Sequence, residues 1–153
     1  MSFQEKNIAV TLVNFTLILS FYLIRIFQMF LDKNFNATSL FRLWGIIIIF
    51  AIVATILATI LTHIVSAIIQ AIKTGGEEPD IAEDMMADER DELIDLKGTK
   101  ISYSVSSAGG FLSMLMFALG QPPLMMFGLL IFFGLVAQIV GDILRLRLYR
   151  RGF

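Results

Sequence analysis

Four long apolar runs divide the sequence, and they cover residues 8–31, 43–72, 101–119 and 122–144. Each run reaches or nearly reaches the ~20 residues that a helix needs to cross the hydrocarbon core of a bilayer. None of them alternates with the period of two expected for a membrane-spanning strand, and a helix satisfies its own backbone groups in lipid. The pattern therefore predicts an all-α fold, a four-helix transmembrane bundle built from two helical hairpins.

The same pattern predicts a single integral membrane domain over residues 1–153. The first run is longer than the ~7–15 apolar residues of a signal peptide, so we expect it to stay as an anchor. The second run, 43–72, would extend over ~45 Å as a helix, so it must tilt or project beyond the bilayer. Gly120–Pro123 separates the last two runs and predicts a tight helical hairpin.

A charged loop, residues 73–100, separates the two hairpins. Ten of the thirteen acidic residues lie between Glu77 and Asp95. Thr74–Pro79 contains helix breakers and predicts a linker, whereas Ile81–Leu96 has neither Pro nor Gly. We therefore expect a short cytoplasmic amphipathic helix before the third span.

The basic residues predict the orientation. With four crossings, nine Lys and Arg residues lie on the side of the termini, and Lys33 and Arg42 lie on the other. Basic residues favour the cytoplasmic side, so the N-terminus, the C-terminus and the acidic loop are expected to be cytoplasmic.

Composition narrows the class of function. The mean hydropathy is +0.80, the net charge is −1 and cysteine is absent. These values favour the lipid bilayer as the partner and argue against nucleic-acid binding, thiol chemistry and thiolate metal sites. No nucleotide-binding or hydrolase motif occurs, so the sequence predicts neither an enzyme nor a bound cofactor.

The acidic segment carries the most distinctive pattern. Asp88, Asp91 and Asp95 fall at i, i+3 and i+7 and share one helical face. Three readings are open: a solvated helix with salt bridges, a partner-docking surface, and a weakly indicated site for a divalent cation, because EF-hand spacing is absent. The candidate docking residues are Asp88, Glu89, Arg90, Asp91, Asp95, Lys97 and Tyr103.

The stretch D-E-R-D-E-L-I-D-L-K-G-T-K-I-S-Y, residues 88–103, runs directly into an apolar span. It resembles a signature in small uncharacterised bacterial and archaeal multi-pass membrane proteins, and the resemblance covers Asp88–Ser107. It implies a polytopic protein of the bacterial plasma (inner) membrane with this loop in the cytoplasm. It implies no catalytic residues.

Four polar residues lie inside or at the ends of apolar runs: Arg25, His63, Gln138 and Asp142. For His63, a hydrogen-bonded structural role, a proton or ligand role, and an intersubunit metal or haem ligand are open. Arg25 is expected near the outer interface, and Asp142 is expected to pair with Arg145 or with a lysine of the loop. Gln138 is expected to form hydrogen bonds across helices.

Small residues predict close helix packing. Ser102, Ser106 and Gly110 recur every four residues in the third run, and Gly134 and Gly141 lie in the fourth. Such spacing lets helix backbones approach closely, either within one chain or in a homo-oligomer.

Two functional hypotheses follow. The first is a non-enzymatic interaction or regulatory protein of the plasma membrane that docks a membrane-complex partner through the cytoplasmic acidic loop. The second is a subunit of a small oligomeric transporter or channel, with a path along His63, Gln70 and Gln138.

Overall fold

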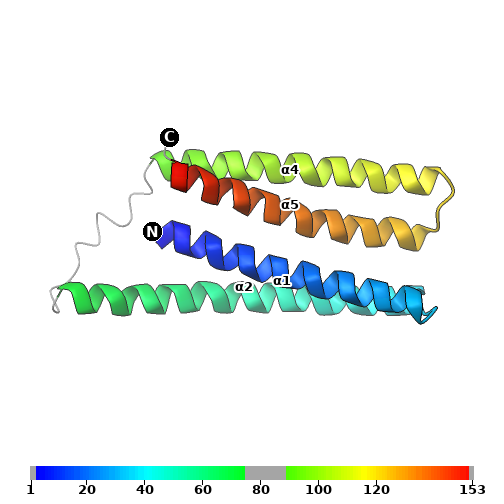
Figure 1. Ribbon diagram of the computed structural model, residues 1–153, viewed down its shortest axis with the longest axis horizontal. Helices are drawn as coiled ribbons and strands as arrows, with labels where there is room; N and C mark the ends of the chain where they lie inside the picture. Colours follow the sequence, from blue (N-terminus) through cyan, green and yellow to red (C-terminus); the bar gives the residue numbers. More distant parts are fainter. Residues whose placement is uncertain (1–2, 75–88, 152–153) are drawn as a thin grey trace.

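The computed structural model describes residues 3–74 and 89–151, which form four long helices and two short connections (Figure 1). No strand occurs among these residues, so the predicted all-α fold is confirmed. The helices are α1 (Phe3–Leu31), α2 (Ala37–Thr74), α4 (Glu89–Ala118) and α5 (Pro123–Arg151).

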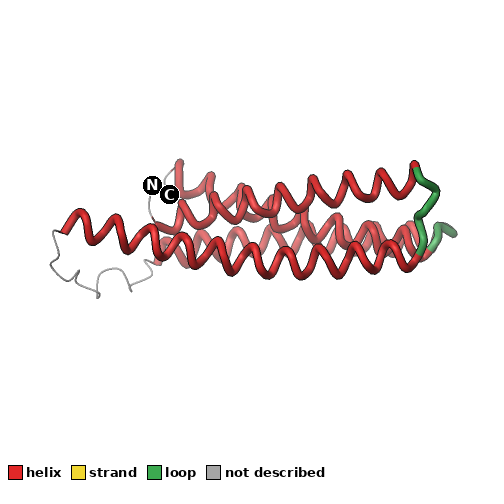
Figure 2. Tube along the Cα trace, turned by 90° about the horizontal axis from the view of Figure 1, so that it is seen from below, coloured by secondary structure: helices red, strands yellow, loops and turns green. Residues whose placement is uncertain are grey.

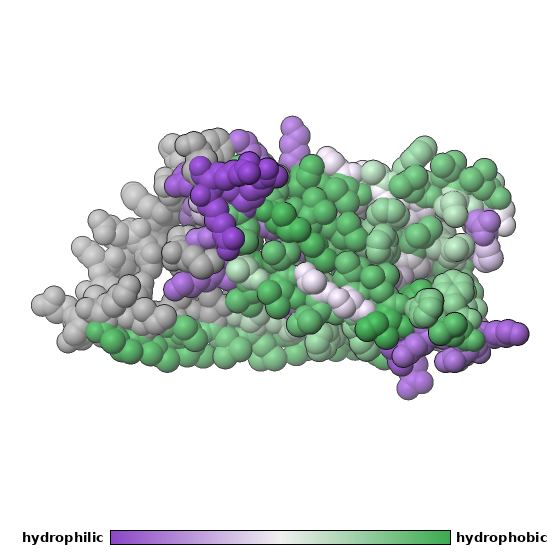
Figure 3. Space-filling model, viewed as in Figure 1, coloured by the Kyte–Doolittle hydropathy of each residue, from purple (hydrophilic) through white to green (hydrophobic). Residues whose placement is uncertain are grey.

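All four helices are long and apolar enough to cross a membrane. Apolar side chains cover the middle of the face seen in Figure 3, and hydrophilic residues gather toward its two ends. In water such a surface would drive aggregation, whereas a bilayer solvates it. The exposed apolar surface is therefore typical of a multi-pass membrane protein.

The helices extend beyond the apolar runs that predicted them. α1 begins at Phe3, α4 begins at Glu89 and α5 ends at Arg151, all outside those runs. The physical reason is that a helix needs apolar side chains only within the hydrocarbon core, which is ~30 Å thick. At ~1.5 Å per residue, α2 with its 38 residues is longer than that core even when it is tilted.

The expected amphipathic helix is continuous with the third span. Its described part, residues 89–96, forms the beginning of α4, and residues 81–88 lie outside the described part of the chain. Gly98 does not interrupt the helix, because the side chain of Arg145 packs directly over it and a Cβ there would overlap that side chain. The acidic segment is thus a rigid extension of the span.

The two predicted hairpins pack side by side as an open row. α1 packs against α2, and α4 packs against α5. The hairpins meet mainly through α1 and α5, and within the described residues α4 contacts no helix other than α5. The order across the molecule is therefore α4, α5, α1, α2, as Figure 1 shows.

The two ends of the row differ. Nε of Arg150 lies 3.3 Å from Oε1 of Glu5, so α5 ends where α1 begins, and we call this the terminal end. Both connecting loops lie at the opposite, hairpin end (Figure 2). In the second loop, Gly120 has a φ of +88°, which ends α4 in the left-handed conformation before Pro122 and Pro123 start the next helix. The predicted tight hairpin at residues 120–123 is therefore confirmed.

The buried core lies in the hairpin-end half, where α1, α2 and α5 meet. Its centre consists of Ile18, Tyr22, Leu43, Ile47 and Leu135. The hydroxyl of Tyr22 donates a 2.6 Å hydrogen bond to the carbonyl oxygen of Gly128, which links α1 to α5 in a buried setting. This bond fixes the junction between the two hairpins.

Replacing Tyr22 with Phe removes this interhelical bond and keeps the ring. Interhelical hydrogen bonds in membrane proteins contribute roughly 0.6–1.7 kcal/mol, so we expect the free energy of unfolding to fall by about 1 kcal/mol in a dodecyl sulfate titration of the detergent-solubilised protein. Ser20→Ala is the matched control, because the Ser20 hydroxyl bonds only to the Thr16 carbonyl of its own helix. Equal losses in both variants would contradict a hairpin-joining role for Tyr22.

Candidate functional site

A charged cluster joins α4 to α5 near the terminal end, and Arg145 of α5 is its centre. Nε of Arg145 lies 2.9 Å from Oδ1 of Asp95, and Nη1 lies 2.9 Å from Oδ1 of Asp142. Nη2 donates a 2.8 Å hydrogen bond to Oγ1 of Thr99. Each nitrogen of the guanidinium therefore has a partner, and the expected pairing of Asp142 with Arg145 is confirmed.

Asp142 is the deeply buried member of this cluster, with a side chain only 4% exposed. Nε2 of Gln138 lies 3.2 Å and 3.4 Å from its two carboxylate oxygens. Gln138 was expected to form hydrogen bonds across helices, but this bond joins residues four apart on α5, because a helix places i and i+4 on one face. The buried carboxylate is thus balanced by one cation and one amide.

Small residues allow α4 and α5 to approach closely around the cluster. A Cβ at Gly141 would overlap Oγ of Ser102 and lie 3.1 Å from the carbonyl oxygen of Gly98. A Cβ at Gly109 would overlap the ring of Phe133. Ser102 and Gly141 therefore pack together as small-residue partners.

The other predicted packing residues behave differently. A Cβ added to Gly110 or Gly134 would meet nothing within 4 Å, so neither glycine makes a close helix contact within this chain. Gly134 and Ser106 instead line a polar cavity of about 310 Å³ between α4 and α5. Its other lining residues are Thr99, Ser102, Tyr103, Ala137, Gln138 and Arg145.

The acidic face predicted for docking turns toward α5. Asp95 binds Arg145, and Asp91 lies beside Tyr149, whose hydroxyl the sequence analysis did not single out. Arg90 and Lys97 are exposed. Of the remaining candidates, Asp88 lies outside the described residues, and Glu89 is described only as the first residue of α4.

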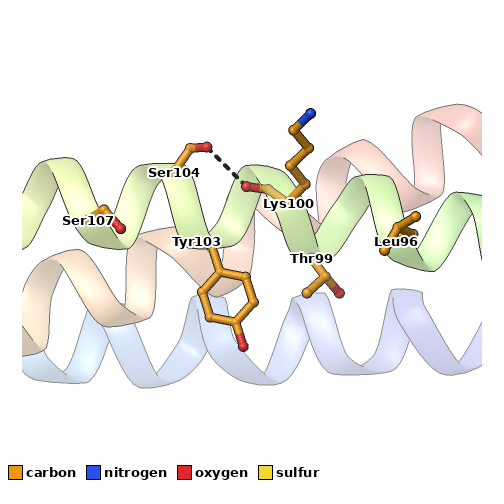
Figure 4. A pocket seen from close by; sticks show the side chains of 6 residues that line it. All are labelled: Leu96, Thr99, Lys100, Tyr103, Ser104 and Ser107. Atoms are coloured by element: carbon orange, nitrogen blue, oxygen red, sulfur yellow. Dashed lines mark hydrogen bonds between the residues drawn. The ribbon is translucent and has the colours of Figure 1, made fainter.

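A second face of α4 lies beside the face that packs on α5 and is exposed, and we call it the outer face: Glu92, Leu96, Tyr103 and Ser107. Leu96 is 63% exposed and Tyr103 is 71% exposed. A hollow of about 560 Å³ runs along α4 beside Leu96, Tyr103 and Ser107. Figure 4 shows Tyr103 and Thr99 on one side of the helix and Lys100 on the other. Helical spacing could have identified this face, but only the packing shows that it is uncovered.

His63 and Arg25 lie away from the charged cluster. His63 is on an exposed part of α2, which does not contact α4 within the described residues. Nη1 of Arg25 donates a 3.2 Å hydrogen bond to Gln28, and its guanidinium lies 6.0 Å from the ring centre of Phe21. The structure therefore does not bring His63 or Arg25 together with Gln138 and Asp142.

Within residues 3–74 and 89–151, no group of three or more His, Cys, Asp or Glu residues is placed to hold a metal ion. The cation-binding reading of the acidic segment extends to Asp88 and stays untested there. Within the described residues Arg145 pairs with Asp95 of α4 and with Asp142 of its own helix.

Comparison with known protein-family models, curated proteins and solved structures gave no significant match. The resemblance of Asp88–Ser107 to small multi-pass membrane proteins therefore stays a prediction.

Replacing Arg145 with Met leaves the Asp142 carboxylate buried with only an amide partner. Breaking a buried pair costs about 3–5 kcal/mol, and we expect a loss near the lower value because Asp95 is 71% exposed and can be hydrated. Adding Asp142→Asn should restore most of the free energy of unfolding, measured by dodecyl sulfate titration.

Arg147→Met is the matched control, since Arg147 lies on the same helix and is exposed. An Arg145→Met variant as stable as Arg147→Met would show that the cluster does not join α4 to α5.

Proposed function

We propose that this chain is a non-enzymatic membrane interaction protein that docks a partner on the outer face of α4. One observation carries the proposal: within the described residues α4 packs against α5 alone, which leaves Glu92, Leu96, Tyr103 and Ser107 uncovered. The acidic segment expected to dock the partner is the start of this same helix. The docking surface therefore runs from that segment into the membrane span.

The chemistry of the outer face supports a protein partner over lipid alone. The Tyr103 phenol is 71% exposed, and no hydrogen bond involves it or the Ser107 hydroxyl among the described residues. Lipid tails offer no hydrogen-bond partner, whereas a neighbouring helix does. Large aromatic side chains also anchor many protein interfaces.

The charged cluster supports the proposal by fixing how α4 is turned. Arg145 holds Asp95 and Thr99 toward α5, while Glu92 and Leu96 beside them stay exposed. A docking helix that is already ordered loses little conformational entropy when it binds. The rigid continuation of the span into the acidic segment thus favours recognition.

We further propose a bacterial plasma membrane location with both termini in the cytoplasm. The supporting observations are the nine-to-two distribution of basic residues and the location of Glu5 and Arg150 at one end of the row. In that orientation Glu92 lies at the cytoplasmic surface, where a basic group of a partner can reach it.

A photoreactive amino acid in place of Tyr103 should form covalent adducts with protein in native membranes. The matched control is Phe27, another aromatic residue, which is 64% exposed on α1 and should give lipid adducts only. Adducts are separated by gel mobility and identified by mass spectrometry. The same adducts from both positions, or none with protein, would refute docking on the outer face.

A second candidate function, a subunit of an oligomeric transporter or channel, is favoured by the polar cavity between α4 and α5. Ser102, Ser106 and Gln138 contribute hydrogen-bonding groups to this space of about 310 Å³. Because this cavity lies within one helix pair, a complete path would require further copies. His63 lies on α2, away from this helix pair, so this version of the hypothesis does not use it.

If the cavity conducts, Gln138→Leu should reduce ion flux from loaded proteoliposomes, because it removes an amide that lines the cavity. His63→Ala is the control and should leave the flux unchanged. Wild-type flux in the Gln138→Leu variant, or no flux above protein-free liposomes, would rule out conduction through this cavity.

A further inference from the structure

Two uncovered surfaces lie toward opposite edges of the row of helices. The outer face of α4 lies at one edge, and the side of α1 and α2 lies at the other (Figure 1). The second surface is a groove of about 630 Å³ between α1 and α2, lined by Asn14 and by the small residues Ala54 and Ala58.

The groove exists because α1 and α2 pack tightly only in their hairpin-end halves. The buried residues Ile18 and Tyr22 of α1 and Leu43 and Ile47 of α2 all lie there. Closer to the terminal end, Val13 and Leu61 line the groove and remain 60% exposed. The two helices therefore leave room for a third element between them.

Asn14 indicates that an element packed in the groove would carry a polar group at the level of this residue. Its side-chain nitrogen is buried and makes no hydrogen bond among the described residues. An unpaired amide in an apolar site is unfavourable, and rotation of the amide exchanges its nitrogen and oxygen. The buried nitrogen is out of reach of a group in the groove, but the amide oxygen of Asn14, which lines the groove, can accept a hydrogen bond there.

Two residues of opposite charge, Lys6 of α1 and Glu92 of α4, lie at similar heights at the terminal end. Glu5 contacts Arg150, and Asp91 lies beside Tyr149, so Glu5 and Asp91 lie at nearly the same height along α5. Lys6 and Glu92, the next residue on each helix, therefore also lie at similar heights. Both are exposed, Lys6 lines the mouth of the groove, and neither has an ion pair among the described residues.

Two polar side chains deeper in the membrane, Asn14 of α1 and Tyr103 of α4, also lie at similar heights. Asn14 lies ~12 Å beyond Lys6 along α1, and the Cα of Tyr103 lies ~16 Å beyond that of Glu92 along α4. Helical side chains lean toward the N-terminus, which brings the Tyr103 hydroxyl back toward the level of Asn14. Both helices begin at the terminal end, so they are parallel in a shared membrane (Figure 1).

We infer that the outer face of α4 docks into the α1–α2 groove of a second copy of this chain, with Glu92 paired to Lys6 and Tyr103 beside Asn14. This inference rests on the proposed docking function and names its partner. Ala54 and Ala58 on α2 are spaced i, i+4 and permit close approach of a helix to the groove. Because the two surfaces differ, the contact is head-to-tail and repeats from copy to copy.

The test uses the full chain carrying two different affinity tags, co-expressed and purified in nanodiscs. Lys6→Glu and Glu92→Lys are each expected to lower co-purification of the two tagged copies about tenfold, as for the loss of a favourable interfacial charge pair. The chain that carries both changes should recover it, because the opposite charges meet again. Arg147→Glu, on an exposed residue outside both surfaces, should have no effect.

Asn14→Ala should also lower co-purification of the two tagged copies. It changes no charge, so the distribution of basic residues that sets the membrane orientation stays the same. A photoreactive residue at position 103 should form adducts with the peptide that contains Asn14 in the other copy. Single charge variants that associate like wild type, or a double variant as weak as the singles, would overturn the inference.

The same adducts separate the two proposals. Adducts between position 103 and a different protein would overturn self-association and leave the docking function standing. Lipid adducts alone, together with a monomeric chain, would overturn both.

Discussion

The packing of α5 is the constraint on which the arrangement of the chain depends. It contacts all three other helices, and the hairpins are joined mainly where it meets α1. Its small residues make this possible: Gly128 accepts the Tyr22 hydrogen bond, and Gly141 lets α4 approach. With α5 in this central position, the four helices form an open row, and no other described residue covers its two edges.

Arg145 determines how α4 is turned within that row. Its guanidinium binds Asp95 and Thr99 of α4 and Asp142 of its own helix, while its stem lies over Gly98. An arginine fork forms directional bonds, so it fixes the rotation of a helix better than apolar contact does. One face of the acidic segment consequently packs against α5, and Glu92 and Leu96 on its other faces are exposed among the described residues.

The uncovered edges explain why the proposed function is association and why copies of the same chain suit it. Apolar contact in a membrane gains little over lipid, so association there depends on close packing and on polar pairs. The outer face of α4 and the groove beside Asn14 each offer both.

The sequence by itself determined the features that depend on local chemistry. The four spans follow from bilayer thickness and the hairpin at residues 120–123 from its Gly and Pro residues, whereas for Asp142 the sequence left Arg145 and a lysine of the loop open as partners. Only the tertiary structure decided that Asp91 and Asp95 face α5, that Tyr22 reaches Gly128 and that the groove beside Asn14 stays open. The physical reason is that lipid-facing and helix-facing positions are equally apolar in a membrane, so hydropathy cannot show which faces meet.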